Sequence, residues 1–151
     1  MFSLARYIAL RKNRSTTKTA ILPLSCIKKA FILIDRTEEE YELAEKIAEE
    51  FFKGKGIEAV IIAPDKKNLG LLGRIKRKIR GERHEDLFIS LYPANRFEAE
   101  YEAKCSGARF KVGRYSFKDN IFDLIVRDRE NEISKQWEVF ETIKDLLEKI
   151  K

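Results

Sequence analysis

Short apolar segments alternate along this chain with segments of helical periodicity, and this alternation limits the folds that the chain can adopt. Five segments predict strands, at residues 29–35, 57–63, 86–91, 108–115 and 122–126. The first reads Lys-Ala-Phe-Ile-Leu-Ile-Asp, which is typical of a central strand buried on both faces. Strands separated by helices pair in parallel through right-handed crossovers. We therefore expect an α/β fold with a three-layer, open, mostly parallel five-stranded sheet of the Rossmann-like or flavodoxin-like kind.

Four segments predict the helices around this sheet. The first follows the first strand, and Thr37 and Glu40 before it have the spacing of a capping box. The others are a short basic helix over residues 68–80, a helix over 95–106 and a long C-terminal helix over 131–150. The inner face expected for the C-terminal helix consists of Ile133, Trp137, Phe140, Lys144, Leu147 and Ile150.

The size of the chain favours a single folded domain. A chain of 151 residues hides roughly 68–70% of its unfolded surface on folding, enough for one core. No stretch approaches the roughly 20 apolar residues of a membrane span. The two cysteines, Cys26 and Cys105, lie far apart and indicate a reducing, cytoplasmic setting. We divide the chain into a basic N-terminal helix or arm, residues 1–25, and one α/β domain, residues 26–151.

The basic residues are unevenly distributed. Residues 1–34 contain no Asp or Glu. A second basic cluster spans residues 74–83, up to Arg83, and contains one acidic residue, Glu82. Segregated charge creates a local potential that the net charge of +6 would not create if it were spread evenly. The candidate anion-binding residues are Arg6, Arg11, Lys12, Arg14, Arg74, Lys76, Arg77, Lys78 and Arg80.

The acid-free leader allows three interpretations. Residues 1–25 are rich in Arg, Ser and Thr, which is the composition of a mitochondrial transit peptide. Residues 2–12 instead predict a basic helix that stays on the protein, and the segment could also be a flexible tail. We favour the retained helix.

The expected strand ends offer little for a cofactor. Open α/β sheets bind ligands at the carboxyl ends of their strands, where Asp35, Ser90 and Tyr92 are the candidates for a small ligand. A dinucleotide site needs a glycine-rich turn there, but residues 35–40 read Asp-Arg-Thr-Glu-Glu-Glu, and their carboxylates would repel phosphate. His84 is the only histidine, so we expect no Cys/His metal site. We assign no cofactor, no metal and no catalytic residue, and we lean against an enzyme.

Three motifs carry a resemblance to a known family. They are Phe-Ile-Leu-Ile-Asp at residues 31–35, Lys-Cys-Ser-Gly-Ala-Arg-Phe-Lys-Val-Gly at 104–113 and Phe-Asp-Leu-Ile-Val at 122–126. The layout resembles a family of short, uncharacterised Bacteroidota proteins known only as a domain of unknown function. Residues 106–113 are also similar to the acceptor-side, N-terminal half of heptosyltransferase-like glycosyltransferases. The resemblance implies a Rossmann-like half-domain without an established activity, because the glycine-rich loop and the second, donor-binding domain of those enzymes are missing.

Three functions remain open. The first is electrostatic binding of nucleic acid or the ribosome through the basic clusters, which lack the exposed aromatic signature of sequence-specific RNA binding. The second is association with an anionic membrane surface through the N-terminal basic helix. The third is binding of a small ligand at the strand ends by a glycosyltransferase-related half-domain. A homodimer through the C-terminal helix is compatible with any of them.

Overall fold

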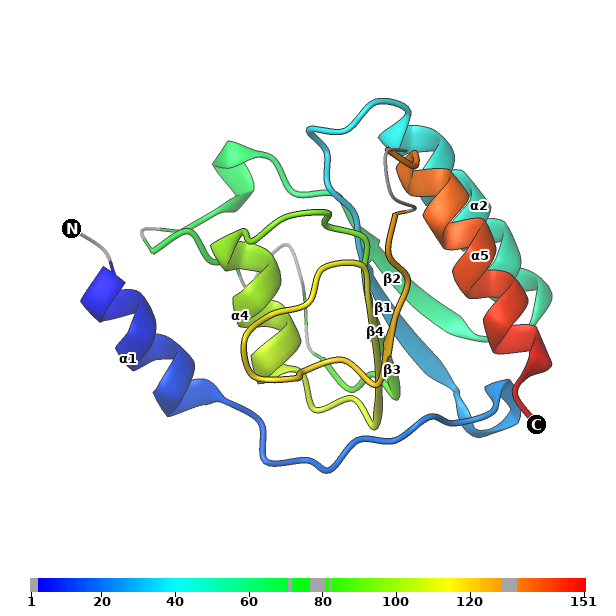
Figure 1. Ribbon diagram of the computed structural model, residues 1–151, viewed down its shortest axis with the longest axis horizontal. Coiled ribbons are helices and arrows are strands. Elements are labelled where there is room, and N and C mark those ends of the chain that lie inside the picture. The colour runs from blue at the N-terminus through cyan, green and yellow to red at the C-terminus, as the bar shows by residue number, and fades with distance from the viewer. Residues whose placement is uncertain (1–2, 71, 77–80, 82, 129–132) are drawn as a thin grey trace.

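The structure, a computed structural model, has a five-stranded sheet at its centre (Figure 1). It describes residues 3–70, 72–76, 81, 83–128 and 133–151. The strands are β1 (Lys29–Leu33), β2 (Glu58–Ile62), β3 (Leu87–Ser90), β4 (Phe110–Gly113) and β5 (Leu124–Ile125). All neighbouring strands are parallel, in the order β2-β1-β3-β4-β5. The prediction of an open, parallel α/β sheet of the Rossmann-like or flavodoxin-like kind is confirmed.

Helices cover both faces of the sheet, as Figure 1 shows. The α-helices are α1 (Ser3–Asn13), α2 (Tyr41–Gly54), α4 (Phe97–Cys105) and α5 (Gln136–Lys149), and two 3₁₀ turns are η1 (Leu24–Cys26) and η2 (Lys66–Asn68). Helices α2 and α5 pack side by side on one face, while α4 covers the other and α1 lies outside α4. The predicted basic N-terminal helix is therefore present as an outer element.

The core lies on both sides of β1. Ile32 points toward α2 and α5, where it joins a cluster that includes Phe52 and Phe140. Phe31 belongs to the cluster on the α4 face, where its ring stacks on Phe88 with the ring centroids 5.8 Å apart. Neighbouring residues of a strand point to opposite faces, so β1 is buried on both, as its continuous apolar run predicts.

The segment between α1 and β1 runs along the edge where the strands begin. The backbone N–H of Ser15 donates to the carbonyl of Lys104 over 3.0 Å, and that of Ala20 donates to the carbonyl of Arg109 over 2.8 Å. The Thr19 hydroxyl also donates to Asp123 over 2.8 Å. These bonds attach the N-terminal arm to the sheet domain well before β1 begins.

The predicted capping box before α2 is wrong. Helix α2 begins at Tyr41, and Glu40 before it has a left-handed backbone with φ of 59°. Thr37 instead donates through its backbone N–H and its hydroxyl to Asp35 Oδ1, over 3.0 and 2.7 Å. An aspartate that bonds the backbone two residues later forms a turn that competes with helix initiation. The strand-end aspartate thus delays the helix.

The predicted inner face of the C-terminal helix is partly wrong. Helix α5 begins at Gln136, so Ile133 precedes it and is 90% exposed. Trp137 is half-buried at the helix start, where its indole N–H donates to Glu40 over 2.7 Å. The buried residues of the helix are Gln136, Val139, Phe140, Ile143 and Leu147. Phe140 and Leu147 belong to the predicted stripe, but Val139 and Ile143 take the places expected for Trp137 and Lys144.

The helix predicted over residues 68–80 is wrong for its described part. Leu69 and Ile75 pair in an antiparallel bridge, and between them the Gly70 N–H donates to the Arg74 carbonyl over 2.6 Å. Gly73 has a φ of +83°, a conformation that glycine adopts without strain. We call these described residues, 69–70 and 72–76, the 69–76 turn. Residues 77–80 lie outside the described part of the chain.

Candidate functional site

The predicted small-ligand residues lie at one edge of the sheet, where β1 and β3 end side by side. In a sheet of this order, that is the switch point at which ligands bind. Asp35, Ser90 and Tyr92 are all buried there. Burial raises the pKa of the Tyr92 hydroxyl, and the nearby charges of Glu98 and Asp35 raise it further. The structure therefore gathers the three predicted residues at this edge but leaves them little contact with solvent.

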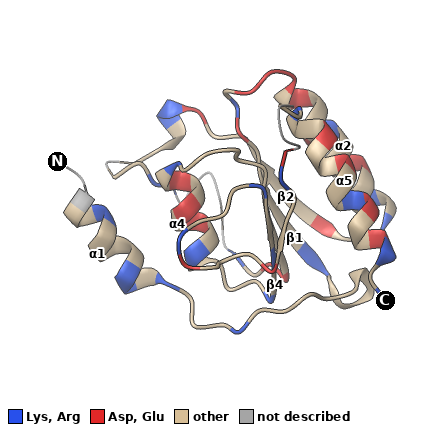
Figure 2. Ribbon diagram, in the orientation of Figure 1, with Lys and Arg blue, Asp and Glu red and all other residues tan. Residues whose placement is uncertain are grey.

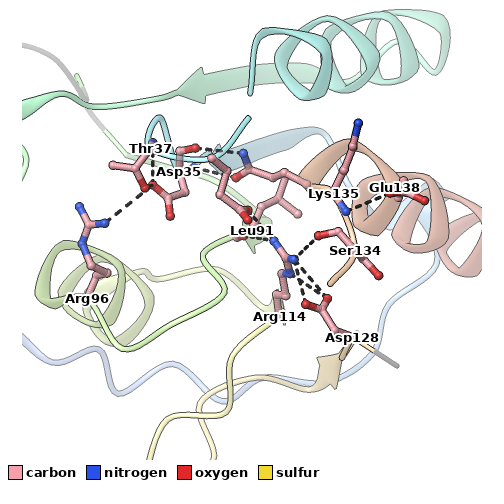
Figure 3. Close-up of polar contacts among 11 residues, drawn as sticks. Asp35, Thr37, Leu91, Arg96, Arg114, Asp128, Ser134, Lys135 and Glu138 are labelled. Atoms are coloured by element: carbon pink, nitrogen blue, oxygen red, sulfur yellow. Dashed lines mark hydrogen bonds and ion pairs between the residues drawn. The ribbon is translucent and has the colours of Figure 1, made fainter. Parts of the chain in front are cut away.

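The polar groups of Asp35 are bonded to other parts of the protein (Figure 3). Its carboxylate accepts from Thr37 and lies 3.8 Å from the Arg96 guanidinium. Its backbone N–H donates to Gln136 Oε1 over 2.6 Å, and its carbonyl accepts from Gln136 Nε2 over 3.0 Å. Asp35 thereby joins the end of β1 to the start of α5.

Arg114, which the sequence analysis did not single out, occupies the same edge. It directly follows β4, and its side chain is 1% exposed. Its guanidinium lies 2.6 Å from Glu38. It also lies 3.1 Å from both carboxylate oxygens of Asp128 and donates to the Ser134 carbonyl over 2.6 Å (Figure 3). A buried charge is costly unless such partners surround it. Arg114 therefore holds the segments that follow β1 and β5 against the end of β4.

The contacts of Asp35 and Arg114 oppose the binding of a small ligand at the strand ends. Burial raises the pKa of Glu38, and the charge and hydrogen bond of Arg114 oppose that rise. A small ligand would have to replace bonds that Asp35, Glu38 and Arg114 already make with the protein. Among the described residues, no group of three or more His, Cys, Asp or Glu side chains is placed to hold a metal ion.

The two basic segments meet beside α4. Arg6 of α1 donates through Nε to the carbonyl of Leu72 in the 69–76 turn over 3.0 Å. Its guanidinium lies over the Phe97 ring of α4, 4.7 Å from the centroid. Arg74 lies over the next ring, that of Tyr101, at 5.1 Å and donates to its hydroxyl over 3.0 Å. Arginine–aromatic contacts therefore join α1 and the 69–76 turn, far apart in sequence, to one helix.

A groove runs between α1 and α4. Two adjoining cavities of about 600 and 390 Å³ share Tyr7, Leu10, Lys104 and Asp119 in their walls. We call them together the α1–α4 groove. Its basic lining residues are Arg6, Arg11, Arg14, Lys104 and Lys118, and its acidic ones are Glu100 and Asp119.

Ion pairs neutralise part of this groove. Lys104 Nζ lies 3.1 Å from Glu100 and 3.0 Å from Asp119, and Arg14 lies 3.3 Å from Asp119. The hydrogen bond and the charge of Lys104 lower the pKa of Asp119. Arg11 and Lys118 are exposed and form no ion pair with the described residues. Positive charge therefore remains along the rim.

The structure separates the predicted anion-binding residues into groups. Arg6, Arg11 and Arg14 line the groove. Lys12 and Lys76 are exposed, on α1 and in the 69–76 turn, and Arg74 packs on Tyr101. Arg77, Lys78 and Arg80 lie outside the described residues.

Arg83 does not belong to the exposed cluster in which its sequence position placed it. It pairs with Glu85 and Glu102, and its guanidinium stacks 4.0 Å from the centroid of Phe31. The groove residues Lys104 and Lys118 were missed by the sequence analysis. Lys104 lies four residues after Glu100, a spacing that indicates a helix pair, but no pattern in the sequence places Lys118 beside it.

Comparison with known proteins shows a relationship at the level of the family. The model of a family of unknown function (DUF6913) matches residues 2–150 of this chain. The match includes α1 and the groove as well as the sheet. Comparisons with curated proteins and with solved structures found no match. Within the described residues, no helix combines the length and apolar character needed to cross a bilayer.

Proposed function

We propose that this chain, which belongs to the family of unknown function DUF6913, binds nucleic acid through a basic surface formed by α1, the 69–76 turn and the α1–α4 groove. The observation that supports the proposal most directly is the bond from Arg6 to the Leu72 carbonyl. It places two basic segments, separated by more than sixty residues, on the same side of α4. A partner with regularly spaced phosphates can contact both at once, and each contact releases counterions.

The two helices on the opposite face of the sheet from α1 are acidic. Helix α1 contains Arg6, Arg11 and Lys12 and no acidic residue. Helices α2 and α5 each contain four acidic residues and two lysines, as the red segments in Figure 2 illustrate. A polyanion is therefore attracted to the α1 side and repelled from the α2–α5 side, which orients its approach.

The basic residues divide into two roles in this proposal. Arg6 and Arg74 are positioning residues, because their guanidinium groups stack on Phe97 and Tyr101 and bond within the protein. The exposed cations Arg11, Lys12, Lys76 and Lys118 are the residues that contact phosphates. Contacts of this kind hold and orient nucleic acid without reading its sequence.

The test is a charge-removal variant with a matched control. Replacing Arg11, Lys12, Lys76 and Lys118 by Gln should weaken binding of a labelled RNA at low salt. It should also reduce the slope of log affinity against log salt by about three, since each phosphate contact contributes about 0.7 to 0.9. The control carries Gln at four exposed lysines elsewhere, Lys46, Lys53, Lys149 and Lys151, and has the same net charge. An equal loss of affinity in both variants would show that net charge alone, not this surface, attracts RNA.

One observation favours a second candidate, binding to an anionic membrane surface. Leu4, Tyr7 and Ile8 of α1 are more than half exposed, beside the basic residues of its last turn. Apolar side chains flanked by cations are typical of helices that lie in a membrane interface. Replacing Leu4 and Ile8 by Ser should then reduce flotation with phosphatidylserine vesicles. Flotation that is the same with purely zwitterionic vesicles would count against this candidate.

Four more specific expectations from the sequence stay predictions. They concern the Bacteroidota origin of the family, a relationship to glycosyltransferases with a small ligand at Asp35, Ser90 and Tyr92, a homodimer through the C-terminal helix, and a cytoplasmic location. Binding of a small ligand at these residues would perturb the NMR signals of the residues around Arg114.

A further inference from the structure

The α1–α4 groove combines cations with an accessible aromatic ring. Tyr7 lies in the walls of both adjoining cavities and is 57% exposed. The other ring of the groove, Phe97, is half-buried beneath Arg6. The exposed cations Arg11 and Lys118 belong to the same lining. The groove thus offers one ring face for stacking and cations within reach of the same ligand.

We infer that the α1–α4 groove holds a single-stranded segment of nucleic acid, with an unpaired base against Tyr7 and its flanking phosphates at Arg11 and Lys118. The inference rests on the proposed function and names the substrate of that same site. Proteins that bind single strands without sequence preference combine a basic groove with rings on which bases stack.

A duplex does not fit this chemistry. Its bases are stacked inside the helix, and bringing one onto a surface ring costs a few kcal/mol of unstacking. The outer side of α1 presents Leu4 and Ile8, which have no polar group to offer a base edge or a phosphate in a duplex groove. The basic and aromatic residues instead meet in the groove, whose larger cavity of about 600 Å³ is of the size that holds a small ligand.

The acidic residues of the groove do not oppose this ligand. Asp119 lies within 3.3 Å of Arg14 and 3.0 Å of Lys104, and Glu100 lies 3.1 Å from Lys104. Their charges are therefore balanced by Lys104 and Arg14. The rim cations are left to attract phosphate.

The experiment compares three probes on the full chain at low salt: a labelled 12-nucleotide oligouridylate, a 12-base-pair RNA duplex and heparin. Tyr7→Leu should weaken oligouridylate binding roughly 5- to 150-fold, the range found for loss of one stacked base. Heparin binding should not change, because it depends on charge alone. Tyr41→Leu is the control, since Tyr41 is a partly exposed ring beside Arg36, at α2 on the acidic side. It should leave the binding of every probe unchanged.

The outcomes separate this inference from the proposed function. If duplex and oligouridylate bind equally and Tyr7→Leu changes neither, the inference is overturned while polyanion binding stands. If no nucleic acid or heparin binds, both fall, and flotation with phosphatidylserine vesicles in that case would favour the membrane candidate. A second measurement does not depend on a variant: ultraviolet cross-linking of 4-thiouridine-containing oligouridylate should give an adduct within residues 3–13. Adducts confined to other residues would contradict the inference.

Discussion

Buried cations at the residue scale connect parts of this protein that lie far apart in sequence. Arg83 pairs with Glu85 and Glu102 on the α4 face, and Arg114 joins Glu38 to Asp128 at the strand ends. Sequence patterns identify such residues as cations but not as buried ones. The partners of Arg114 are 76 and 14 residues away, so only the folded chain reveals the pairing.

Lys111 is a third buried cation, and its environment makes it sensitive to pH. It lies in β4 beneath α4, and its Nζ donates to the Ala103 carbonyl over 2.8 Å. Burial, followed by the positive charge of Arg83, lowers the pKa of Lys111 to about 8. The native protein therefore releases this proton at a lower pH than the unfolded chain, whose lysines have a pKa of about 10.4.

We predict that stability rises with pH because of Lys111. Between about pH 8 and 10.4 the unfolded chain binds more protons at this lysine than the native chain does. The free energy of unfolding should therefore increase across that window by at most about 1.4 kcal/mol per pH unit, and this contribution is lost as the pH falls through 8. Lys111→Met should lack the increase. Urea unfolding of both proteins at several pH values measures the difference.

The comparison removes the contributions of other groups, because wild type and variant share every other titrating residue. Lys46→Met, at an exposed position of α2, is the matched control and should follow the wild-type pH profile. A parallel profile for Lys111→Met and wild type would mean that Lys111 keeps an ordinary pKa in the native state.

At the scale of elements, a strand or helix was predictable where its segment of sequence fits a single pattern of apolar residues. The five predicted strands agree in position with β1 to β5. The pattern over residues 68–80 was ambiguous, because its apolar spacing also suits a chain that reverses at Gly70 and Gly73. Helix α4 was located correctly, but it is covered on both sides. Its contact with the sheet is made by two small residues, Ala99 and Ala103.

At the scale of elements, Gly73 should govern how α1 is held. A Cβ atom at Gly73 would meet the Arg6 guanidinium at 3.0 Å, and the positive φ adds strain for any other residue. Gly73→Ala should cost about 1 kcal/mol of stability or slightly more and displace Arg6 from Phe97. Hydrogen exchange should then be faster in residues 3–13.

Gly56→Ala provides the control for backbone strain. Gly56 also has a positive φ, of 69°, but a Cβ there meets nothing within 4 Å. It should lower stability by a similar amount while leaving hydrogen exchange in α1 unchanged. Equal acceleration in the two variants would indicate that α1 responds to global stability and not to Arg6.

The whole molecule has an uneven distribution of charge that could be predicted only in part from the sequence. The excess of basic residues near the N-terminus was visible in the sequence. That this segment would meet the 69–76 turn was not visible, because the meeting depends on a contact between Arg6 and Leu72 across the fold. The candidate groove was unpredictable for the same reason, since α1 and α4 form its walls from distant parts of the chain.

Helix α1 should be dispensable for folding of the sheet domain but not for RNA binding. Of the described part of residues 1–13, a deletion removes one buried apolar residue, Ala9, and the stacking of Arg6 on Phe97. The arm from Ser15 to β1 keeps its backbone bonds. The sheet domain should still unfold cooperatively, with a Tm lower by roughly 5–10 °C, which corresponds to about 2–3 kcal/mol at this size. Oligouridylate binding should be lost, because the deletion removes Tyr7 and one wall of the groove. Calorimetry and fluorescence anisotropy on the same sample measure the two effects. A shortened chain that melts without a cooperative transition would make α1 an integral part of the core, and one that binds RNA as tightly as the full chain would locate the nucleic-acid site elsewhere.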